Sequence, residues 1–433
     1  MLLTLLSFTN YVDLRRNTKL RILALFGVIT LLTASIKADY TFEIFQLPGL
    51  GDRQSSSFWG ISGTGDVLAG YIQESSSFTA LRLEDDSRID LGDLQGGAGN
   101  SIPTDISQDG SIIVGYSFLE FDSFLAGAEA FRWEDGMMTG LGALPGGDGR
   151  SAARAVSTDG AVIVGASASG DSGDLEAFRW EEGTMTGLGF LPDDNSSDVR
   201  DVSGDGTIII GSSGTAGDFA SYVGVKWVNG IISQLPAPDG AANDSVYYPE
   251  AISADGSVII GNQVYWENDT AKFLDLPEGI EGAFASEVSA DGSVIVGFRD
   301  STIIIWNRSS GVYTPTLVEE PIDVSAYGEL RSQPRFQVRA MSPDGSIIVG
   351  DYFIHPVGGR FTTINFIARK NETTNLWGGF EIFNGLGDVD TANWIGWINI
   401  NQAPYIWSYS LGGWIYMDEP SSAGSGAWGY FLR

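Results

Sequence analysis

The sequence has no cysteine and one histidine, His355, among 433 residues. Without cysteine the chain cannot form a disulfide, offer a thiolate nucleophile or bind a metal through sulfur. One histidine is too few for a zinc site with two imidazole ligands, and it leaves a single candidate base for a Ser-His-Asp triad. Both kinds of catalytic site are therefore nearly eliminated. His355 falls in a predicted loop, where a lone histidine is expected to be a surface residue without a catalytic role.

Basic residues are also scarce. The chain carries 24 Lys and Arg against 55 Asp and Glu, a net charge of −31 at pH 7. Phosphate backbones and anionic membrane surfaces are repelled by such a charge. We therefore expect no nucleic-acid partner.

Long apolar runs are nearly absent, and the main one lies close to the N-terminus. Basic residues at positions 15–21 precede an apolar run over 22–33, and small residues then lead to Ala38. This order predicts a secretory signal peptide over residues 1–38, removed after Ala38, with no membrane span left afterwards. A membrane anchor is the alternative, but the run is shorter than the roughly 20 residues that cross a bilayer. The predicted location is extracellular or at the cell surface, with the periplasm as a further option.

What the sequence has in abundance is glycine, 57 residues, much of it in a repeated phrase. The phrase is a serine, a turn and a short β-branched strand ending in glycine, as in VSTDGAVIVGA. Seven copies begin at Ile61, Ile106, Val156, Val202, Ile252, Val288 and Met341. A repeat of this length indicates one supersecondary unit used several times.

The unit reads as four short strands. From Ser151 the apolar segments are Ala153–Ser157, Val162–Ala166, Ala177–Trp180 and Met185–Leu188, each bounded by Gly, Asp or Ser. Asp159-Gly160 is a tight-turn signal, because glycine accepts positive φ without steric cost. Four strands in roughly 40–50 residues is the period of a propeller blade. The sequence therefore predicts an all-β, seven-bladed β-propeller; an open β-solenoid is the alternative, although its repeats are usually shorter and more uniform.

The two ends of the repeat region complement each other. Phe42–Leu47 matches the fourth strand of the unit but precedes the first complete copy. The seventh copy offers only three strand candidates: Phe336–Ser342, Ile347–Asp351 and Ile364–Ala368. We therefore expect the early strand to complete blade seven, which would remove an exposed sheet edge.

The combined pattern EAFRW, GxMxxLGxLPGG and SxAxxVSxDGxxIVGxS resembles the bacterial HAF-type extracellular repeat family over about residues 42–370. Blades five to seven depart from it, since AFRW becomes VYW at Val264 and IIW at Ile304. The resemblance implies an exported, often surface-linked protein with propeller-like repeats. It implies no reaction, and because its motif residues belong to strands and turns there is no catalytic set to carry over.

The residues that recur in each copy are expected to be structural. Aspartate before the turn glycine favours the turn through its own side-chain hydrogen bond, so a ring of ligands is the weaker interpretation of Asp109, Asp159, Asp205, Asp255, Asp291 and Asp344. Packing between blades explains one tryptophan per blade better than a sugar platform does: Trp133, Trp180, Trp227, Trp266 and Trp306. Arg132 and Arg179 are expected to pair with neighbouring acids.

The copies differ mainly in two classes of connection. Those between second and third strands range from Ser117–Glu129 to almost nothing at Asn262-Gln263, and one fourth-to-first connection extends over Leu317–Arg335. In an up-and-down blade both classes emerge on one face, and variable loops on a rigid scaffold commonly carry binding sites. We therefore expect any site near the channel mouth on this face.

Two of these connections are rich in oxygen ligands: Asp171, Asp174 and Glu176, and Asp193, Asp194, Asn195 and Asp198. They could hold calcium, which takes several oxygens at flexible geometry. Neither matches an EF-hand or an RTX nonapeptide, so solvated acidic loops are the preferred interpretation.

Residues 376–433 form a third region after the signal peptide and the propeller, 39–375. They contain half of the chain's 12 tryptophans, in short strand-like segments around glycine turns. We predict a small β-module with tryptophan as its core; an exposed ladder that stacks on polysaccharide is the alternative.

These observations predict an exported, non-enzymatic binding or cell-surface interaction protein. Its partner would be a surface protein or a polysaccharide, and no catalytic, cofactor-binding or metal-binding residue is assigned. A hydrolase or lyase acting on polysaccharide is the alternative, and it would need two placed carboxylates or a Tyr or His base at the channel mouth. A purely structural surface-layer component is a third interpretation.

Overall fold

The computed structural model describes residues 40–371 apart from short segments at 46, 48–49, 51–53, 85–86, 98, 119–126, 171–173, 219, 242–245, 320–328 and 359–361, together with seven strands beyond residue 371. The predicted signal peptide lies outside the described residues. The chain divides into two compact units, Met1–Lys370 and Asn371–Arg433. Each is described by itself.

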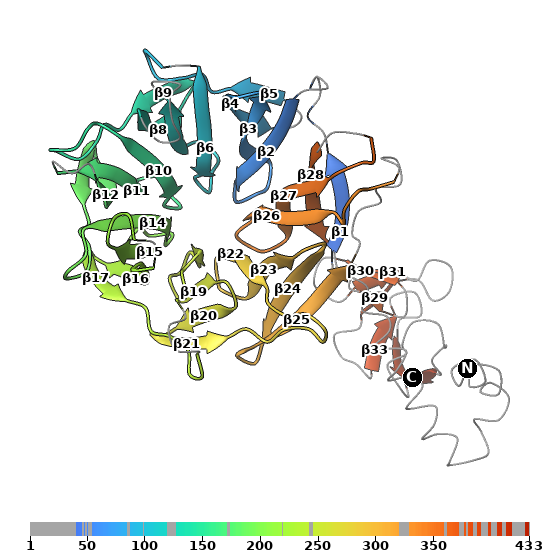
Figure 1. Ribbon diagram of the computed structural model, residues 1–433. Helices are drawn as coiled ribbons and strands as arrows, with labels where there is room; N and C mark the ends of the chain where they lie inside the picture. Colours follow the sequence, from blue (N-terminus) through green and yellow to red (C-terminus); the bar gives the residue numbers. More distant parts are fainter. Residues whose placement is uncertain are drawn as a thin grey trace. The chain divides into compact units, whose positions relative to one another are not determined.

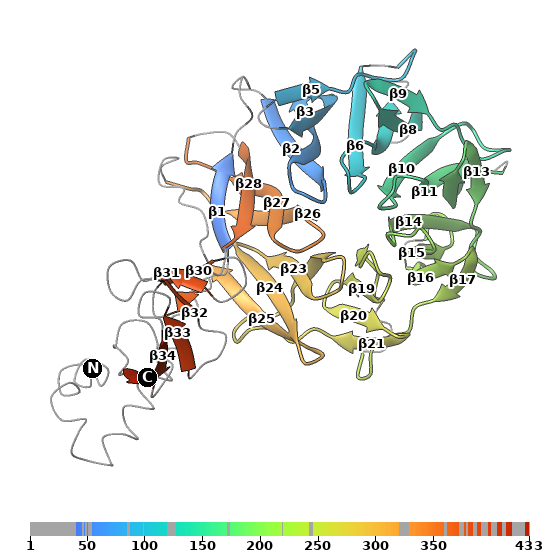
Figure 2. The same cartoon turned by 180° about the vertical axis from the view of Figure 1, so that it is seen from behind.

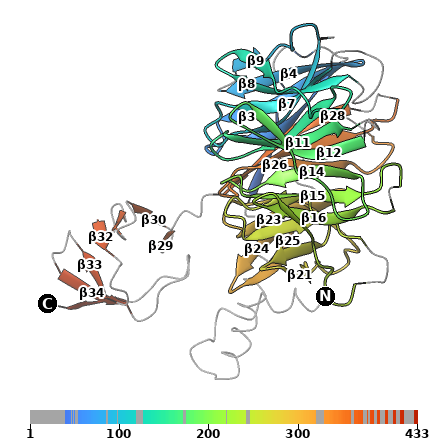
Figure 3. The ribbon, with the colours of Figure 1, turned by 90° about the vertical axis from the view of Figure 1, so that its left-hand side faces the viewer.

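The first unit contains seven four-stranded antiparallel sheets arranged in a ring, as Figures 1 and 2 show from its two faces. Figure 3 views the ring from its edge. The predicted seven-bladed β-propeller is therefore confirmed.

Blades one to three follow the chain in order, from the innermost strand outwards. Their strands are β2 (Gln54–Ile61), β3 (Val67–Glu74), β4 (Ser77–Glu84), β5 (Ser87–Asp90), β6 (Asn100–Ile106), β7 (Ile113–Phe118), β8 (Ala128–Glu134), β9 (Met137–Gly140), β10 (Ser151–Val156), β11 (Val162–Ser169), β12 (Asp174–Glu181) and β13 (Thr184–Gly187).

Blades four to six continue the pattern. Their strands are β14 (Ser196–Val202), β15 (Ile208–Gly214), β16 (Val223–Val228), β17 (Ile231–Gln234), β18 (Ala251–Ile252), β19 (Val258–Gly261), β20 (Val264–Glu267), β21 (Thr270–Phe273), β22 (Phe284–Val288), β23 (Val294–Arg299), β24 (Thr302–Ser309) and β25 (Val312–Glu319).

Burial falls from the inner strands of a blade to the outer one, which explains the sequence pattern. In β11 every residue but the last is buried, whereas in β13 three of the four residues are exposed. A strand covered on both faces by neighbouring blades reads as a continuous apolar run, and an outer strand does not need one. The β-branched end of each repeat phrase is therefore the sequence signature of the second strand.

Blade seven is closed by the two ends of the repeat region. It consists of β26 (Arg335–Met341), β27 (Ile347–Ile354), β28 (Thr362–Lys370) and β1 (Tyr40–Phe45), and β1 pairs antiparallel with β28. Figure 1 shows β1, in blue, beside the orange strands. The predicted closure is confirmed, with the strand beginning two residues earlier than expected.

Each repeat phrase folds into a hydrogen-bonded turn around a buried serine. In blade three the Ser157 hydroxyl donates to Asp159 Oδ1 at 2.7 Å and accepts the Val162 N–H at 2.9 Å. Asp159 Oδ1 also accepts the Ala161 N–H at 3.0 Å, and this hydrogen bond, with that of Ser157, lowers the pKa of the carboxyl group. Gly160 has φ 73°, and a Cβ there would lie 2.0 Å from Ile112 Cδ1 of blade two. The turn interpretation of the repeated aspartates is confirmed.

The same turns are joined from blade to blade through the main chain. The N–H of the residue after the serine donates to the C=O of its counterpart in the next blade at four successive junctions and again between blades six and seven: Gly63 to Gln108, Gln108 to Thr158, Thr158 to Gly204, Gly204 to Ala254 and Ala290 to Pro343, at 2.7–3.1 Å. Between blades five and six the donor is Asp255 instead. Pro343 has no N–H, so blade seven cannot donate in this way to blade one.

A buried polar cluster lies at that last junction. Ser57 of blade one donates to Asp351 Oδ2 at 2.7 Å, and Asn365 Nδ2 donates to the Ser56 carbonyl at 2.9 Å. Arg339 forms an ion pair with Asp351 at 2.7 Å. Asp351 and Asn365 are 1% and 3% exposed, so these contacts form in a low-dielectric setting where hydrogen bonds are strong.

The repeated tryptophans pack between blades, as expected. Trp227 Nε1 donates to the Leu188 carbonyl of the preceding blade at 3.0 Å, and Trp306 Nε1 donates to the Asp275 carbonyl at 2.7 Å. Trp180 is half-buried, while the other four are buried. The predicted arginine pairing is also confirmed, with Arg132 on Glu134 at 2.6 Å and Arg179 on Glu181 at 3.1 Å.

The second unit contains one antiparallel sheet whose strands follow each other in chain order. They are β29 (Leu376–Trp377), β30 (Phe380–Phe383), β31 (Asp388–Asp390), β32 (Trp397–Asn399), β33 (Tyr405–Ser408), β34 (Gly413–Met417) and β35 (Gly429–Leu432). Whether the tryptophans form a core or a ladder concerns side chains that lie outside the description. In the part of the chain that is described, no helix has the length and apolar character needed to cross a membrane.

The turn geometry makes a stability prediction. Ser157→Ala leaves the buried Val162 N–H without its acceptor, so the free energy of unfolding should fall by about 1–3 kcal/mol. Thr184→Ala, an exposed change in the same blade, should alter it by less than about 0.5 kcal/mol. Urea unfolding followed by tryptophan fluorescence measures both. Equal effects of the two changes would contradict the role given to the serine.

Candidate functional site

Every innermost strand presents one extra residue to the centre of the ring. A β-bulge interrupts the pairing of the first two strands three residues before the repeat serine, at Trp59, Thr104, Arg154, Arg200, Ser286 and Arg339. In blade five Glu250 occupies this position, and its N–H donates at 2.7 Å to the carbonyl of Ile260, the residue that faces Ala251. Bulges re-aim side chains and are common beside functional sites.

These seven side chains line a cavity of about 410 Å³, called here the channel cavity. Its wall also includes Asn262, in the short connection after β19, Phe284 at the start of β22, and Phe298 near the end of β23. All three lie where the variable connections leave the strands. The cavity therefore reaches the face on which a site was expected.

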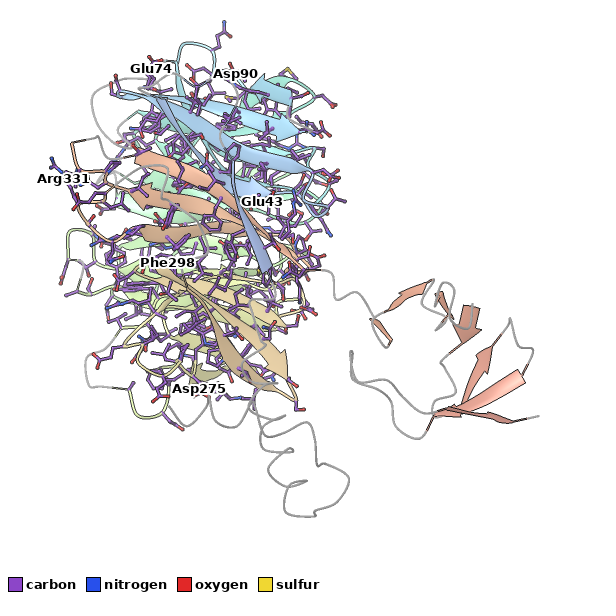
Figure 4. The ribbon with its side chains drawn as sticks, turned by 90° about the vertical axis from the view of Figure 1, so that its right-hand side faces the viewer. Glu43, Glu74, Asp90, Asp275, Phe298 and Arg331 are labelled. Atoms are coloured by element: carbon purple, nitrogen blue, oxygen red, sulfur yellow. The ribbon has the colours of Figure 1, made fainter. Side chains whose placement is uncertain are left out.

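The side view supports this assignment of faces. Glu74 ends β3, before a second-to-third connection, and Arg331 belongs to the fourth-to-first connection that leads into blade seven. In the side view of Figure 4, both lie on the same side of the propeller, so they belong to the same face of the ring. The two variable classes of connection thus share a face.

A second ring of residues lies one position further along each innermost strand. Blades two, four and six carry Asp105, Asp201 and Glu287 there. The other blades carry small residues: Gly60, Ala155, Ala251 and Ala340. All seven line the channel cavity. The acids thus alternate with small residues, which leaves room for three carboxyl groups in a narrow space.

Two of these acids also connect neighbouring blades. Asp105 Oδ1 accepts the Ile106 N–H at 2.7 Å, and Oδ2 accepts the Val156 N–H of blade three at 2.8 Å. Asp201 repeats the arrangement at 2.7 and 2.8 Å, with its Oδ2 on Ile252 of blade five. Both oxygens of each carboxyl group are therefore held by main-chain donors.

The surroundings of the three acids raise the pKa values of their carboxyl groups. Burial raises the pKa of Asp105 to about 7, with a further increase from the charge of Asp201, while hydrogen bonds from Val156 and Ile106 lower it. Burial likewise raises the pKa of Asp201 to about 7. The pKa of Glu287 is raised well above its usual value by burial and by Asp201, Asp105 and Glu250. The acids therefore tend to keep their protons below neutral pH.

Three of the seven bulge positions carry arginine, and these arginines differ in their partners. Arg339 is fixed by Asp351 and lies 4.9 Å from the centre of the Trp59 ring. Arg154 Nη2 lies 3.6 Å from Asp198 Oδ2, and its buried Nε has no acceptor among the described residues. Arg200 is exposed and makes no hydrogen bond or ion pair with the described part of the chain. The cavity thus contains one arginine that is firmly paired within the protein, Arg339, and two with N–H donors that lack acceptors among the described residues, Arg154 and Arg200.

The candidates from the sequence lie elsewhere. His355 is half-buried between β27 and β28, and its carbonyl accepts the Arg331 N–H at 2.7 Å. Of the acidic loops, Asn195 Nδ2 donates to Asp174 at 3.0 Å and Asp194 accepts the Ser213 hydroxyl at 2.6 Å, while Asp171 lies outside the described residues. The described residues contain no group of three or more His, Cys, Asp or Glu that could hold a metal.

The residues of the channel cavity were missed by the sequence analysis, although they left a signal. Aligning the seven phrases on their serines places the acids at the second residue before it in every other copy. The bulge residues one position earlier form no pattern and include three arginines. The phrase itself is uniform, whereas the positions that precede it vary from copy to copy.

The comparisons with known proteins concern the fold. No family model matches the chain, and no curated protein sequence matches it. Among solved structures it is similar to TolB from Acinetobacter baumannii, with 14% identity, coverage of 74% of this chain and 66% of that one, and a TM-score of 0.35. It is also similar to an oligogalacturonate lyase in complex with manganese, with 13% identity, coverage of 77% and 97%, and a TM-score of 0.47.

A third similar structure is oligogalacturonate lyase from Vibrio parahaemolyticus, with 11% identity, coverage of 77% and 98%, and a TM-score of 0.47. These neighbours are propeller proteins. At such identities the likeness concerns the fold alone.

The raised pKa values predict how stability depends on pH. A carboxyl group whose pKa is raised to about 7 in the folded state binds its proton more tightly there than in the unfolded chain. The free energy of unfolding should therefore fall as the pH rises from about 4 to about 7. Asp201→Ala should make this decline shallower, by an amount on the order of 1–4 kcal/mol across the window.

The measurement is urea unfolding at pH 4.5, 6 and 8. Alanine already stands at the equivalent position of blades three, five and seven, so the ring tolerates it there. Asp148→Ala, at the surface, is the control and should keep the wild-type profile. A parallel profile for Asp201→Ala and wild type would mean that Asp201 does not carry the pH dependence.

Proposed function

We propose that this chain is an exported, non-enzymatic binding protein that acts at the cell surface or outside the cell, and that its ligand occupies the channel cavity. One observation carries the proposal: side chains from all seven innermost strands converge on a cavity of about 410 Å³ that reaches the variable-loop face. That volume lies within the usual range of small-ligand sites.

The form of the site supports binding. Most of its polar groups stand on strands rather than on loops, so they are held in place before a ligand arrives. The bulges give each blade an independent side chain, and these range from Trp59 through Thr104 and Ser286 to arginine and glutamate. Seven different positions on one rigid ring allow selective recognition without moving the scaffold.

Export and a surface role rest on the sequence. The basic-then-apolar segment before Ala38, the high negative charge and the resemblance to HAF-type extracellular repeats agree with one another. The expected partner is a polysaccharide or a surface protein, with the channel cavity receiving a terminal group of it. The net charge of −31 argues against nucleic acid.

A polysaccharide hydrolase or lyase is the second candidate, and the acids of the cavity favour it. A carboxyl group with a pKa near 7 suits general acid–base catalysis at neutral pH. Asp105 and Asp201 have such values, but main-chain donors hold both oxygens of each. Glu287 is the freer acid, since its carboxyl group has no hydrogen bond within the described residues. It is the residue to test for turnover.

The proposal is tested by filling the cavity. Ser286→Trp places a large side chain at a bulge where blade one already carries Trp59, so the strand should accommodate it. In glycan-array and insoluble-polysaccharide binding assays of residues 39–433, this variant should bind at least tenfold more weakly than wild type.

The matched control is Thr184→Trp, which adds the same side chain at the exposed start of β13, outside the channel cavity, and should bind normally. Circular dichroism checks that both variants fold. Unchanged binding by Ser286→Trp would overturn the channel site. Cleavage of a bound polysaccharide that disappears in Glu287→Gln would replace the binding proposal by the enzyme.

A further inference from the structure

We infer that the ligand of the channel cavity bears a carboxylate, and that Arg154 and Arg200 bind it. The inference rests on the proposed function, because it takes the channel cavity as the binding site. It adds the chemical class of the ligand and the two residues that select it.

The three arginines of the cavity are not equivalent. Arg339 has its Nε 2.7 Å from Asp351 Oδ2, and its guanidinium lies over Trp59. Asp351 is buried at the junction of blades seven and one, so this arginine is part of the closure of the ring. It is therefore held by the protein rather than offered to a ligand.

Arg154 has donors to spare. A guanidinium has five N–H donors and no acceptor. Among the described residues, Arg154 has one ion pair, the 3.6 Å contact with Asp198, whose other oxygen already accepts the Val199 N–H at 2.9 Å. Its Nε is buried without an acceptor among the described residues, although buried polar groups in folded proteins nearly always have one. An acceptor brought by a ligand would complete this group.

Arg200 stands at the equivalent position of the next blade. Arg154 and Arg200 both line the channel cavity, from β10 and β14, which follow each other around the ring in Figure 1. Arg200 is exposed and makes no ion pair with the described residues. Two planar guanidinium groups from adjacent strands match the two oxygens of a carboxylate, which arginine binds through paired N–H donors.

The acids of the cavity do not neutralise these arginines. Both oxygens of Asp105 and of Asp201 accept main-chain N–H groups, and burial keeps protons on them below about pH 7. Burial also raises the pKa of Glu250, although the positive charge of Arg200 lowers this pKa in part. A monoanion fits this setting better than a phosphate dianion, which would add a second negative charge beside Glu250 and Glu287.

Blade six gives the cavity an aromatic surface for the rest of the ligand. Phe284 is 48% exposed, and its ring centre lies 5.9 Å from that of Phe298. Figure 4 labels Phe298 in the side view. Such a pair accepts the apolar face of a sugar ring or an aliphatic chain. Both a sugar acid and a fatty or aromatic acid share the required carboxylate, and the experiment separates them.

Saturation-transfer NMR on residues 39–433 can detect the weak binding expected of small probes. The observed probes are glucuronate, glucose and hexanoate, and inorganic phosphate, which has no proton to observe, is added as a competitor. Glucuronate or hexanoate should bind, whereas glucose, which lacks the carboxylate, should bind at least tenfold more weakly, and phosphate should displace the bound acid only at a concentration at least tenfold higher than that of the acid. Glucuronate binding would identify a sugar acid, and hexanoate binding would identify an aliphatic acid. Absence of binding by both acids, or preference for phosphate, would overturn the inference.

The residues are tested by Arg154→Gln and Arg200→Gln, each of which should reduce carboxylate binding at least tenfold. Arg132→Gln is the matched control, because that arginine pairs with Glu134 outside the cavity and should leave binding unchanged. If Ser286→Trp blocks the ligand but neither arginine variant weakens it, the channel site stands and the carboxylate inference falls. If filling the cavity has no effect, both fall together.

Discussion

The propeller depends on a series of main-chain hydrogen bonds that joins the turns of successive blades from blade one to blade seven. Each turn is shaped internally by a buried serine, and its next residue then bonds to the neighbouring turn at 2.7–3.1 Å. The two levels are linked, because the main-chain donor and acceptor are aligned only if the serine and the aspartate have set the turn. This explains why the turn phrase varies so little, whereas the strands of blades five to seven depart from their motif.

The variable positions of the channel cavity follow from the same constraint. A chain that must keep each turn in register with the next can vary freely just before the turn, where a bulge releases one residue from the pairing. The bulge positions carry tryptophan, threonine, serine, glutamate and three arginines. Uniform turns and variable bulges thus lie within three residues of each other, and the ring brings all seven variable positions to one cavity.

Much of the fold could be predicted from the sequence because the repeat is local. The repeat period predicts a four-stranded blade, and the number of copies predicts seven blades. The unmatched strand after residue 40 predicts how the last blade is completed. The channel cavity could not be predicted in this way, because Asp105, Asp201 and Glu287 come from copies far apart in the chain and look unremarkable one by one. The differing roles of Arg339 and Arg200 depend on partners such as Asp351, which no spacing in the sequence indicates.

The absence of a main-chain donor at Pro343 makes the last junction different in kind from the others. Neighbouring blades elsewhere meet through segments close in sequence, but Ser56 and Asn365 are 309 residues apart. Contacts of such high contact order form late in folding, since the chain between them must first be ordered. We therefore expect the seventh blade to complete after the other six, and it is the blade that a truncation at either end of the repeat region would disrupt.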